Sequence, residues 1–102
     1  MGQSEMKIYI SGKITGLPFE EVEDNFYNAQ NRLEEKGFKV VNPLNNGLSQ
    51  NDKWEHHMKA DIKLLMECNT IYLLSNWKDS RGARIERDIA VALGYDVIEQ
   101  VR

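Results

Sequence analysis

Asp61 and Glu86 are the acidic residues whose positions are hardest to explain as surface charges. In the segment 52–67, apolar side chains recur every three or four residues, as on one face of a helix. That stripe consists of Trp54, Met58, Ile62 and Leu65, and we assign Trp54 to the core. Asp61 projects into the stripe, so we expect its carboxylate to be at least partly buried. An unpartnered buried carboxylate costs several kcal/mol or takes up a proton, which makes its position a candidate for function.

Glu86 borders the inward face of a second predicted helix, at 82–93. We expect that face to consist of Ile85, Ile89, Ala92 and Leu93, with Arg84, Arg87 and Asp88 on the outer side. The residues one turn from Glu86 are small or apolar and leave space beside its carboxylate. Two structural roles stay open on this geometry: Glu86 caps the helix, or it pairs with Arg81.

The turn before this helix has the composition of an anion-binding site. Ser80-Arg81-Gly82 places a hydroxyl and unpaired backbone N–H groups at the positive end of a helix. Gly82 allows a ligand to approach the backbone closely, and Arg81 or Arg84 can add a charge-assisted contact. Serine before a helix is also a frequent N-cap, so a purely structural explanation of Ser80 stays open.

These residues belong to a chain in which short apolar runs alternate with amphipathic segments. We predict strands at 7–11, 38–41, 70–74 and 95–98, and helices at 19–36, 52–67 and 82–93. Asp52 is the expected N-cap of the second helix. The alternation favours an α/β fold: a three-layer, flavodoxin- or Rossmann-like parallel sheet of four or five strands, in the order 2-1-3-4, with helices on both faces. Because ligands of such sheets bind where the strand order reverses, loops 11–18 and 75–82 should line the site.

Composition narrows the classes of protein that fit. The 102 residues suit a single domain, 1–102, and 41% hydrophobic with 28% charged residues is typical of a soluble globular chain. A net charge of −3 argues against binding of polymeric nucleic acid, which needs a basic face. No apolar run reaches the roughly 20 residues of a membrane span, and residues 1–5 lack a signal-peptide segment. With a single cysteine, Cys68, expected to be buried, we predict a cytoplasmic protein without membrane contact.

Metal and cofactor sites are not indicated, and we predict neither. His56 and His57 are adjacent, so they point to different sides of their helix and do not suit a shared metal ion. Trp77, after the third strand, is placed to stack on a base or to cover a sugar, although ordinary packing also explains it.

Three separated motifs resemble the nucleoside deoxyribosyltransferase superfamily, above all its deoxynucleoside-monophosphate N-glycosidase branch and bacterial and phage members of unassigned activity. The motifs are Ile8-Tyr9-Ile10-Ser11-Gly12-Lys13-Ile14-Thr15-Gly16, then Asp61, then Ser80-x-Gly82-x-x-x-Glu86. The resemblance implies that Glu86 is the nucleophile attacking the anomeric carbon. It also implies that Asp61 positions the substrate or protonates the leaving base, and that Tyr9 hydrogen-bonds the nucleophile. We assign substrate binding to Ser11, Gly12, Lys13, Ile14, Gly16, Trp77, Ser80 and Gly82.

Ser80 favours a monophosphate within this resemblance. The resemblance implies that members acting on nucleosides have an aspartate at this position, which binds the free 5′-hydroxyl. The monophosphate hydrolases carry serine there. A carboxylate repels a phosphate, and a hydroxyl at a helix N-terminus accepts one. We therefore predict N-glycosidic bond cleavage or deoxyribosyl transfer on a small-molecule nucleotide, and the resemblance implies a homodimer.

One feature of the resemblance has no counterpart in the sequence. Members commonly complete the site with a polar residue from a C-terminal segment of a neighbouring subunit, and this chain ends at Arg102, so we expect that contribution to be missing. The loop 42–54 is the candidate to replace it. A catalytically silent nucleotide-binding or sensing module therefore stays open, and so does a partner-binding scaffold, because fold does not fix function.

Overall fold

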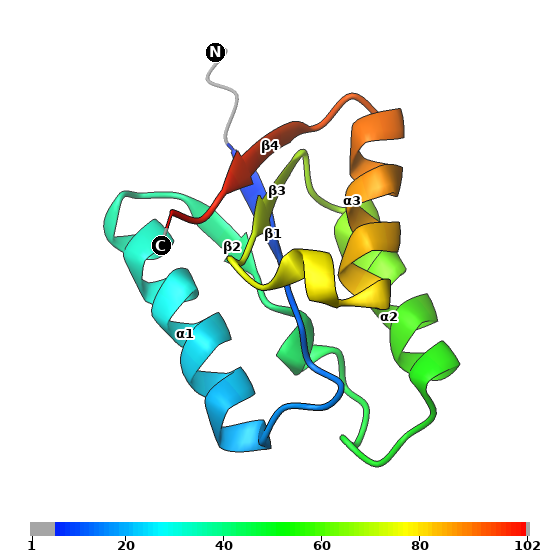
Figure 1. Ribbon diagram of the computed structural model, residues 1–102. Helices are drawn as coiled ribbons and strands as arrows, with labels where there is room; N and C mark the ends of the chain where they lie inside the picture. The colour runs from blue at the N-terminus through cyan, green and yellow to red at the C-terminus, as the bar shows by residue number, and fades with distance from the viewer. Residues whose placement is uncertain (1–5, 102) are drawn as a thin grey trace.

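The computed structural model describes residues 6–101, in which a parallel sheet lies between two layers of helices (Figure 1). The strands are β1 (Lys7–Ser11), β2 (Lys39–Val41), β3 (Thr70–Leu73) and β4 (Asp96–Glu99). They pair in the order β2-β1-β3-β4, and every pair is parallel. The predicted α/β fold and strand order are confirmed, with four strands in the described part of the chain. The predicted cytoplasmic location rested in part on residues 1–5, which lie outside the described residues.

Three helices cover the sheet. α1 (Phe19–Glu35) lies on one face, and α2 (Trp54–Met66) and α3 (Arg81–Ala92) lie side by side on the other (Figure 1). Two short 3-10 turns, η1 (Pro43–Asn45) and η2 (Trp77–Asp79), precede α2 and α3. Within residues 6–101, no helix has the length and apolarity needed to cross a bilayer.

β1 divides its side chains between the two faces, because side chains alternate along a strand. Ile8 and Ile10 pack against α1 in a cluster completed by Val22, Phe26, Ala29, Leu33 and Leu74. Tyr9 belongs to the opposite cluster, with Leu65, Cys68, Ile71, Leu73 and Ala90. Ser11, one step further along the strand, bonds to a side chain of α3. β1 therefore gives apolar side chains to the α1 face and two hydroxyl groups to the face under α2 and α3.

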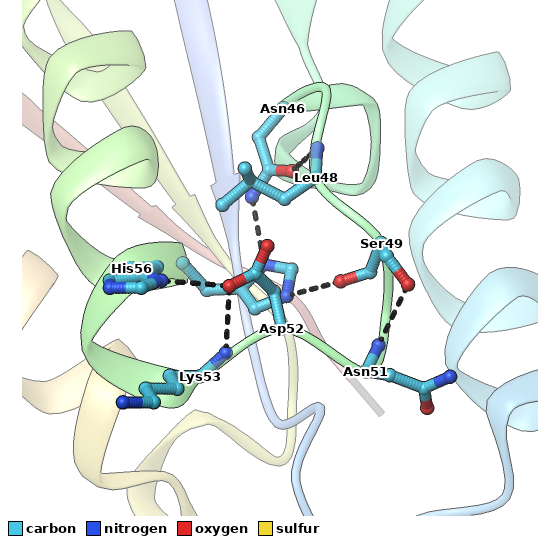
Figure 2. A network of polar contacts seen from close by, with 8 residues as sticks. Asn46, Leu48, Ser49, Asn51, Asp52, Lys53 and His56 are labelled. Atoms are coloured by element: carbon cyan, nitrogen blue, oxygen red, sulfur yellow. Dashed lines mark hydrogen bonds and ion pairs between the residues drawn. The ribbon is translucent and has the colours of Figure 1, made fainter.

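The start of α2 differs from the prediction. Its N-cap is Lys53, which makes no side-chain cap bond, so the assignment of Asp52 as N-cap is wrong. The Asp52 carboxylate accepts a hydrogen bond from the Lys53 N–H, and the same oxygen lies 2.7 Å from Nδ1 of His56 (Figure 2). The Asp52 carboxylate thus contacts the His56 ring and the N–H of the cap residue itself, and it does not cap an N–H of the first turn of α2.

Three residues predicted to face the core, Ala92, Leu93 and Trp54, are exposed. The buried face of α3 consists of Gly82, Ala83, Glu86 and Ala90, whereas Ala92 is exposed and Leu93 is 48% exposed. Trp54 is 38% exposed, and the Arg81 guanidinium lies 4.5 Å from the centroid of its ring. Small residues let α3 approach α2 closely: a Cβ on Gly82 would lie 3.0 Å from Sδ of Met58. The close approach of α3 to α2 therefore determines which face of α3 is buried, and Glu86 lies within that face.

Candidate active site

A cavity of about 430 Å³ lies beyond the end of β1, and three parts of the chain form its wall. The loop after β1 contributes Gly12, Ile14, Thr15 and Leu17, and the start of α3 contributes Ser80, Gly82 and Ala83. Both loops expected to line the site thus reach it. The third part is the segment from η1 into α2, which supplies Leu44, Asn46, Leu48, Gln50, Asp52, Trp54, His57 and Met58. Tyr9, Asp61 and Glu86 line the cavity as well, together with Phe19 and Phe26 of α1 and Pro43 of η1.

Glu86 is held on this wall by two hydroxyl groups of β1. The Tyr9 hydroxyl donates to Oε2 over 3.0 Å, and the Ser11 hydroxyl donates to Oε1 over 2.7 Å. The carboxyl group is buried, with 5% of the residue exposed. Neither structural explanation left open by the sequence applies, because Glu86 bonds to Tyr9 and Ser11 while Arg81 stacks on Trp54. Both carboxyl oxygens are thus oriented by side chains of the sheet.

Burial sets the protonation of Glu86. Loss of solvent raises its pKa to about 8; the Ser11 hydrogen bond lowers it, the nearby charge of Asp61 raises it, and the Tyr9 hydrogen bond lowers it. Burial also raises the pKa of Tyr9 well above its usual value, and the charge of Glu86 raises it further. Tyr9 consequently remains a hydrogen-bond donor throughout the neutral range.

Asp61 is a second buried carboxyl group on the same cavity, with 6% of the residue exposed. Burial raises its pKa to about 6, against the lowering effect of a hydrogen bond from Asn46 and of the neighbouring His57. The Asn46 amide donates to Oδ1 of Asp61 over 2.8 Å. Between pH about 6 and about 8, the pair formed by Asp61 and Glu86 therefore holds one proton. Such a pair offers an acid and a base at the same time.

The N-terminus of α3 forms another part of the wall. Ser80 is its N-cap, and the Ser80 hydroxyl oxygen accepts a hydrogen bond from the Ala83 N–H over 3.1 Å. The hydroxyl hydrogen is left to donate elsewhere. The first turn of a helix also presents backbone N–H groups that lack an acceptor within the helix. Together with Gly82 and the nearby Arg81, this end of α3 suits an anion.

The other residues predicted to bind substrate divide between the cavity and its supports. Gly12 and Ile14 line the cavity. The backbone N–H of Lys13 donates to Oδ1 of Asn76 over 2.9 Å and joins the two loops, while Gly16 takes the turn beyond it with φ +91°. Trp77 packs against the cluster under α3, with the Arg87 guanidinium 5.8 Å from its ring centroid. Ser11 is 1% exposed and acts through Glu86. The structure thus places Ser11, Lys13, Gly16 and Trp77 outside the cavity wall.

Asn46 and His57 are the site residues that the sequence did not reveal. Both line the cavity, and the Asn46 amide nitrogen lies 3.0 Å from Nδ1 of His57. The sequence signal for Asn46 is the asparagine-rich stretch 42–46, which is equally typical of a turn. Among residues 6–101, no group of three or more His, Cys, Asp or Glu side chains could hold a metal ion.

Comparison with solved structures identifies the class of fold. The chain matches "2-desoxiribosyltransferase from Leishmania mexicana" with a TM-score of 0.71 and 19% sequence identity, over 92% of this chain and 63% of that one. The protein therefore has a nucleoside 2-deoxyribosyltransferase-like fold, and it spans about 63% of the length of this structural neighbour. At the level of the family, residues 6–99 match the domain of unknown function DUF4406, and the chain belongs to that family. The search of curated proteins finds no match.

Proposed function

We propose that the protein cleaves the N-glycosidic bond of a deoxynucleoside monophosphate, with Glu86 as the nucleophile and water or a second base as the acceptor. The observation that carries this proposal is the buried Glu86 carboxyl group on the cavity wall, with each oxygen held by a hydroxyl of β1. A structural carboxylate gains nothing from facing a cavity. A nucleophile must face the cavity in order to reach its substrate, and it must be held in a fixed orientation.

In the first step, an ionised Glu86 oxygen forms a bond to the anomeric carbon as the bond from that carbon to the base breaks. The bonding pair leaves with the base nitrogen, and protonated Asp61 supplies the proton that makes the base a better leaving group. In the second step, Asp61 takes a proton from the acceptor, the acceptor bonds to the anomeric carbon, and the bond to Glu86 breaks. Tyr9 and Ser11 keep the carboxylate in line in both steps.

The proposal requires one proton on the carboxyl pair. Between pH about 6 and about 8 the pair carries one proton, which lies mainly on Glu86, and the reactive form is the minority in which this proton lies on Asp61. Below this range both groups are protonated and above it both are ionised, so the reactive form is lost on either side. The rate should therefore follow a bell-shaped pH profile with its maximum between these values.

The wall of the cavity has a polar part and an apolar part, and this division favours a nucleotide as the ligand. The N-terminus of α3, with Ser80, Gly82 and the nearby Arg81, would hold the phosphate. The apolar side chains Phe19, Leu44, Leu48 and Met58 would border the base and sugar. We further propose that the chain works as one domain in a cytoplasmic homodimer on small nucleotides. The net charge of −3 is the reason for preferring these to polymeric nucleic acid.

The test is to incubate deoxynucleoside monophosphates and the matching nucleosides with wild type, Glu86→Gln and Ser80→Asp, and to measure free base. We expect wild type to release base from a monophosphate, and Glu86→Gln to be slower by about a thousandfold or more. Ser80→Asp should lose far more activity on the monophosphate than on the nucleoside, because its carboxylate repels the phosphate. Equal rates for wild type and folded Glu86→Gln would contradict the proposal.

A second candidate is a nucleotide-binding module without turnover. The raised pKa of Glu86, about 8, favours it, because it keeps this carboxyl group largely protonated at neutral pH. Thermal stabilisation by monophosphates, without release of base at any pH between 5 and 9, would identify this function.

A further inference from the structure

The side-chain amide of Asn46 makes three hydrogen bonds, and together they fix its orientation. Its oxygen accepts from the Leu48 N–H over 3.0 Å (Figure 2). Its nitrogen lies 2.8 Å from Oδ1 of Asp61 and 3.0 Å from Nδ1 of His57. A backbone N–H can only donate, so the amide oxygen must face Leu48. The amide nitrogen, with two hydrogens, therefore faces Asp61 and His57.

This orientation assigns the proton on His57. Nδ1 accepts from Asn46, so the ring hydrogen is on Nε2, which lies 2.9 Å from the Ser49 carbonyl oxygen. The His57 ring, on α2, is thus bonded to the loop at both of its nitrogens. Residues 46–49 are fastened to α2 by the Asn46 amide at one end and by the Ser49 carbonyl at the other.

The fastened loop is part of the cavity wall, through Asn46, Leu48, Gln50 and Asp52. We propose that Asn46 is a positioning residue that holds the Asp61 carboxyl group and the wall loop 46–52 in one arrangement. The inference rests on the proposed function, in which Asp61 transfers the proton. Without Asn46, Asp61 would lose the amide that fixes one of its oxygens, and the loop would lose a link to α2.

The electrostatic surroundings of Asp61 agree with this role. The groups that act on it or respond to its charge are His57 on α2, Glu86 on α3 and Tyr9 on β1. Burial raises the pKa of Asp61, and the Asn46 hydrogen bond is the first of the influences that lower it. Removing the amide should therefore move proton loss from Asp61 to higher pH.

The test compares Asn46→Leu with Asn51→Leu, a matched control in the same loop. Asn51 is exposed, and its backbone N–H donates to the Ser49 hydroxyl. The carboxyl carbon of Asp61 is titrated by NMR in each protein. We expect the midpoint to move to higher pH in Asn46→Leu and to stay at the wild-type value in Asn51→Leu. On a substrate that wild type cleaves, kcat should fall roughly tenfold in Asn46→Leu, and the acid limb of the pH profile should move with the NMR midpoint.

The outcomes separate this inference from the proposed function. An unchanged Asp61 titration in Asn46→Leu overturns the inference, even if melting temperature falls, since a merely structural asparagine would have that effect. Absence of base release by wild type contradicts the proposed function and leaves the titration readable. If Asn46→Leu does not fold, Asn46→Asp decides by the same titration. Its second carboxylate should move the Asp61 midpoint still further upward, and an unchanged midpoint overturns the inference.

Discussion

The two faces of the sheet bury different chemistry, although one strand serves both. Under α1, the buried cluster around Ile8 and Ile10 carries no carboxyl group, and the buried Asn42, which bonds to Gln30 of α1, is uncharged. Under α2 and α3, the neighbouring residues Tyr9 and Ser11 meet two buried carboxyl groups, Glu86 and Asp61. Alternation along β1 is sufficient to produce this difference. The comparison suggests that the α1 face stabilises the fold while the opposite face carries groups whose burial opposes stability.

The buried polar groups on the face under α2 and α3 all have hydrogen-bond partners. Among the described residues, every buried side-chain nitrogen or oxygen has a hydrogen-bond partner. For Glu86 and Asp61, those partners are hydroxyl and amide groups, which orient a carboxyl group without giving it an opposite charge. Each carboxyl group therefore keeps a raised pKa, whereas a lysine or arginine partner would have lowered it.

The largest expected effect on stability lies on the apolar face. Leu33→Ala removes a side chain of α1 that is 6% exposed and should lower the free energy of unfolding by about 3 kcal/mol. Urea denaturation at pH 5 and pH 8 measures this loss. Because Leu33 is remote from the carboxyl pair, the loss should be the same at both pH values. A loss that changes strongly with pH would mean that the two faces are not independent.

Glu86→Gln should have an effect of opposite sign that depends on pH. The folded protein holds the Glu86 proton up to a pKa of about 8, against 4.5 for an ordinary glutamate. The stability that wild type gains from this proton is complete below pH 4.5 and is lost as the pH rises through about 8. Glutamine has no proton to lose, so the variant should gain stability relative to wild type steadily as the pH rises from 5 to 8. Thermal unfolding across this range provides the check, and a constant difference would show that Glu86 is not a strained carboxyl group.

Tyr9→Phe should have the smallest effect and should sharpen the comparison further. The substitution keeps the packing of the ring and removes the donor to Oε2 of Glu86. Loss of this hydrogen bond should cost about 1 kcal/mol where Glu86 is ionised, and less at pH 5, where it is protonated. Urea denaturation of this variant at pH 5 and pH 9 is the measurement. Equal losses at the two pH values would assign Tyr9 a role in packing alone.

The sequence predicted the polar face better at its centre than at its margins. Strand order, the burial of Asp61 and the hydrogen bond from Tyr9 to Glu86 were all expected, because hydrophobic periodicity and the resemblance specify them. Trp54 was misplaced because periodicity does not reveal a neighbouring helix with a glycine at the point of contact. Asn46 was missed because its partners lie on α2, and no local pattern encodes contact between an irregular loop and a helix.

The central claim is that Glu86 attacks the anomeric carbon, and trapping the sugar on the protein tests it most directly. A deoxynucleoside monophosphate that wild type cleaves is mixed with excess enzyme, quenched with acid within one turnover, and examined by peptide mass spectrometry. The predicted result is a deoxyribose phosphate adduct on the peptide that contains Glu86, absent from Glu86→Gln. Base release without any adduct, or an adduct on another residue, would contradict the assignment of Glu86 as the nucleophile.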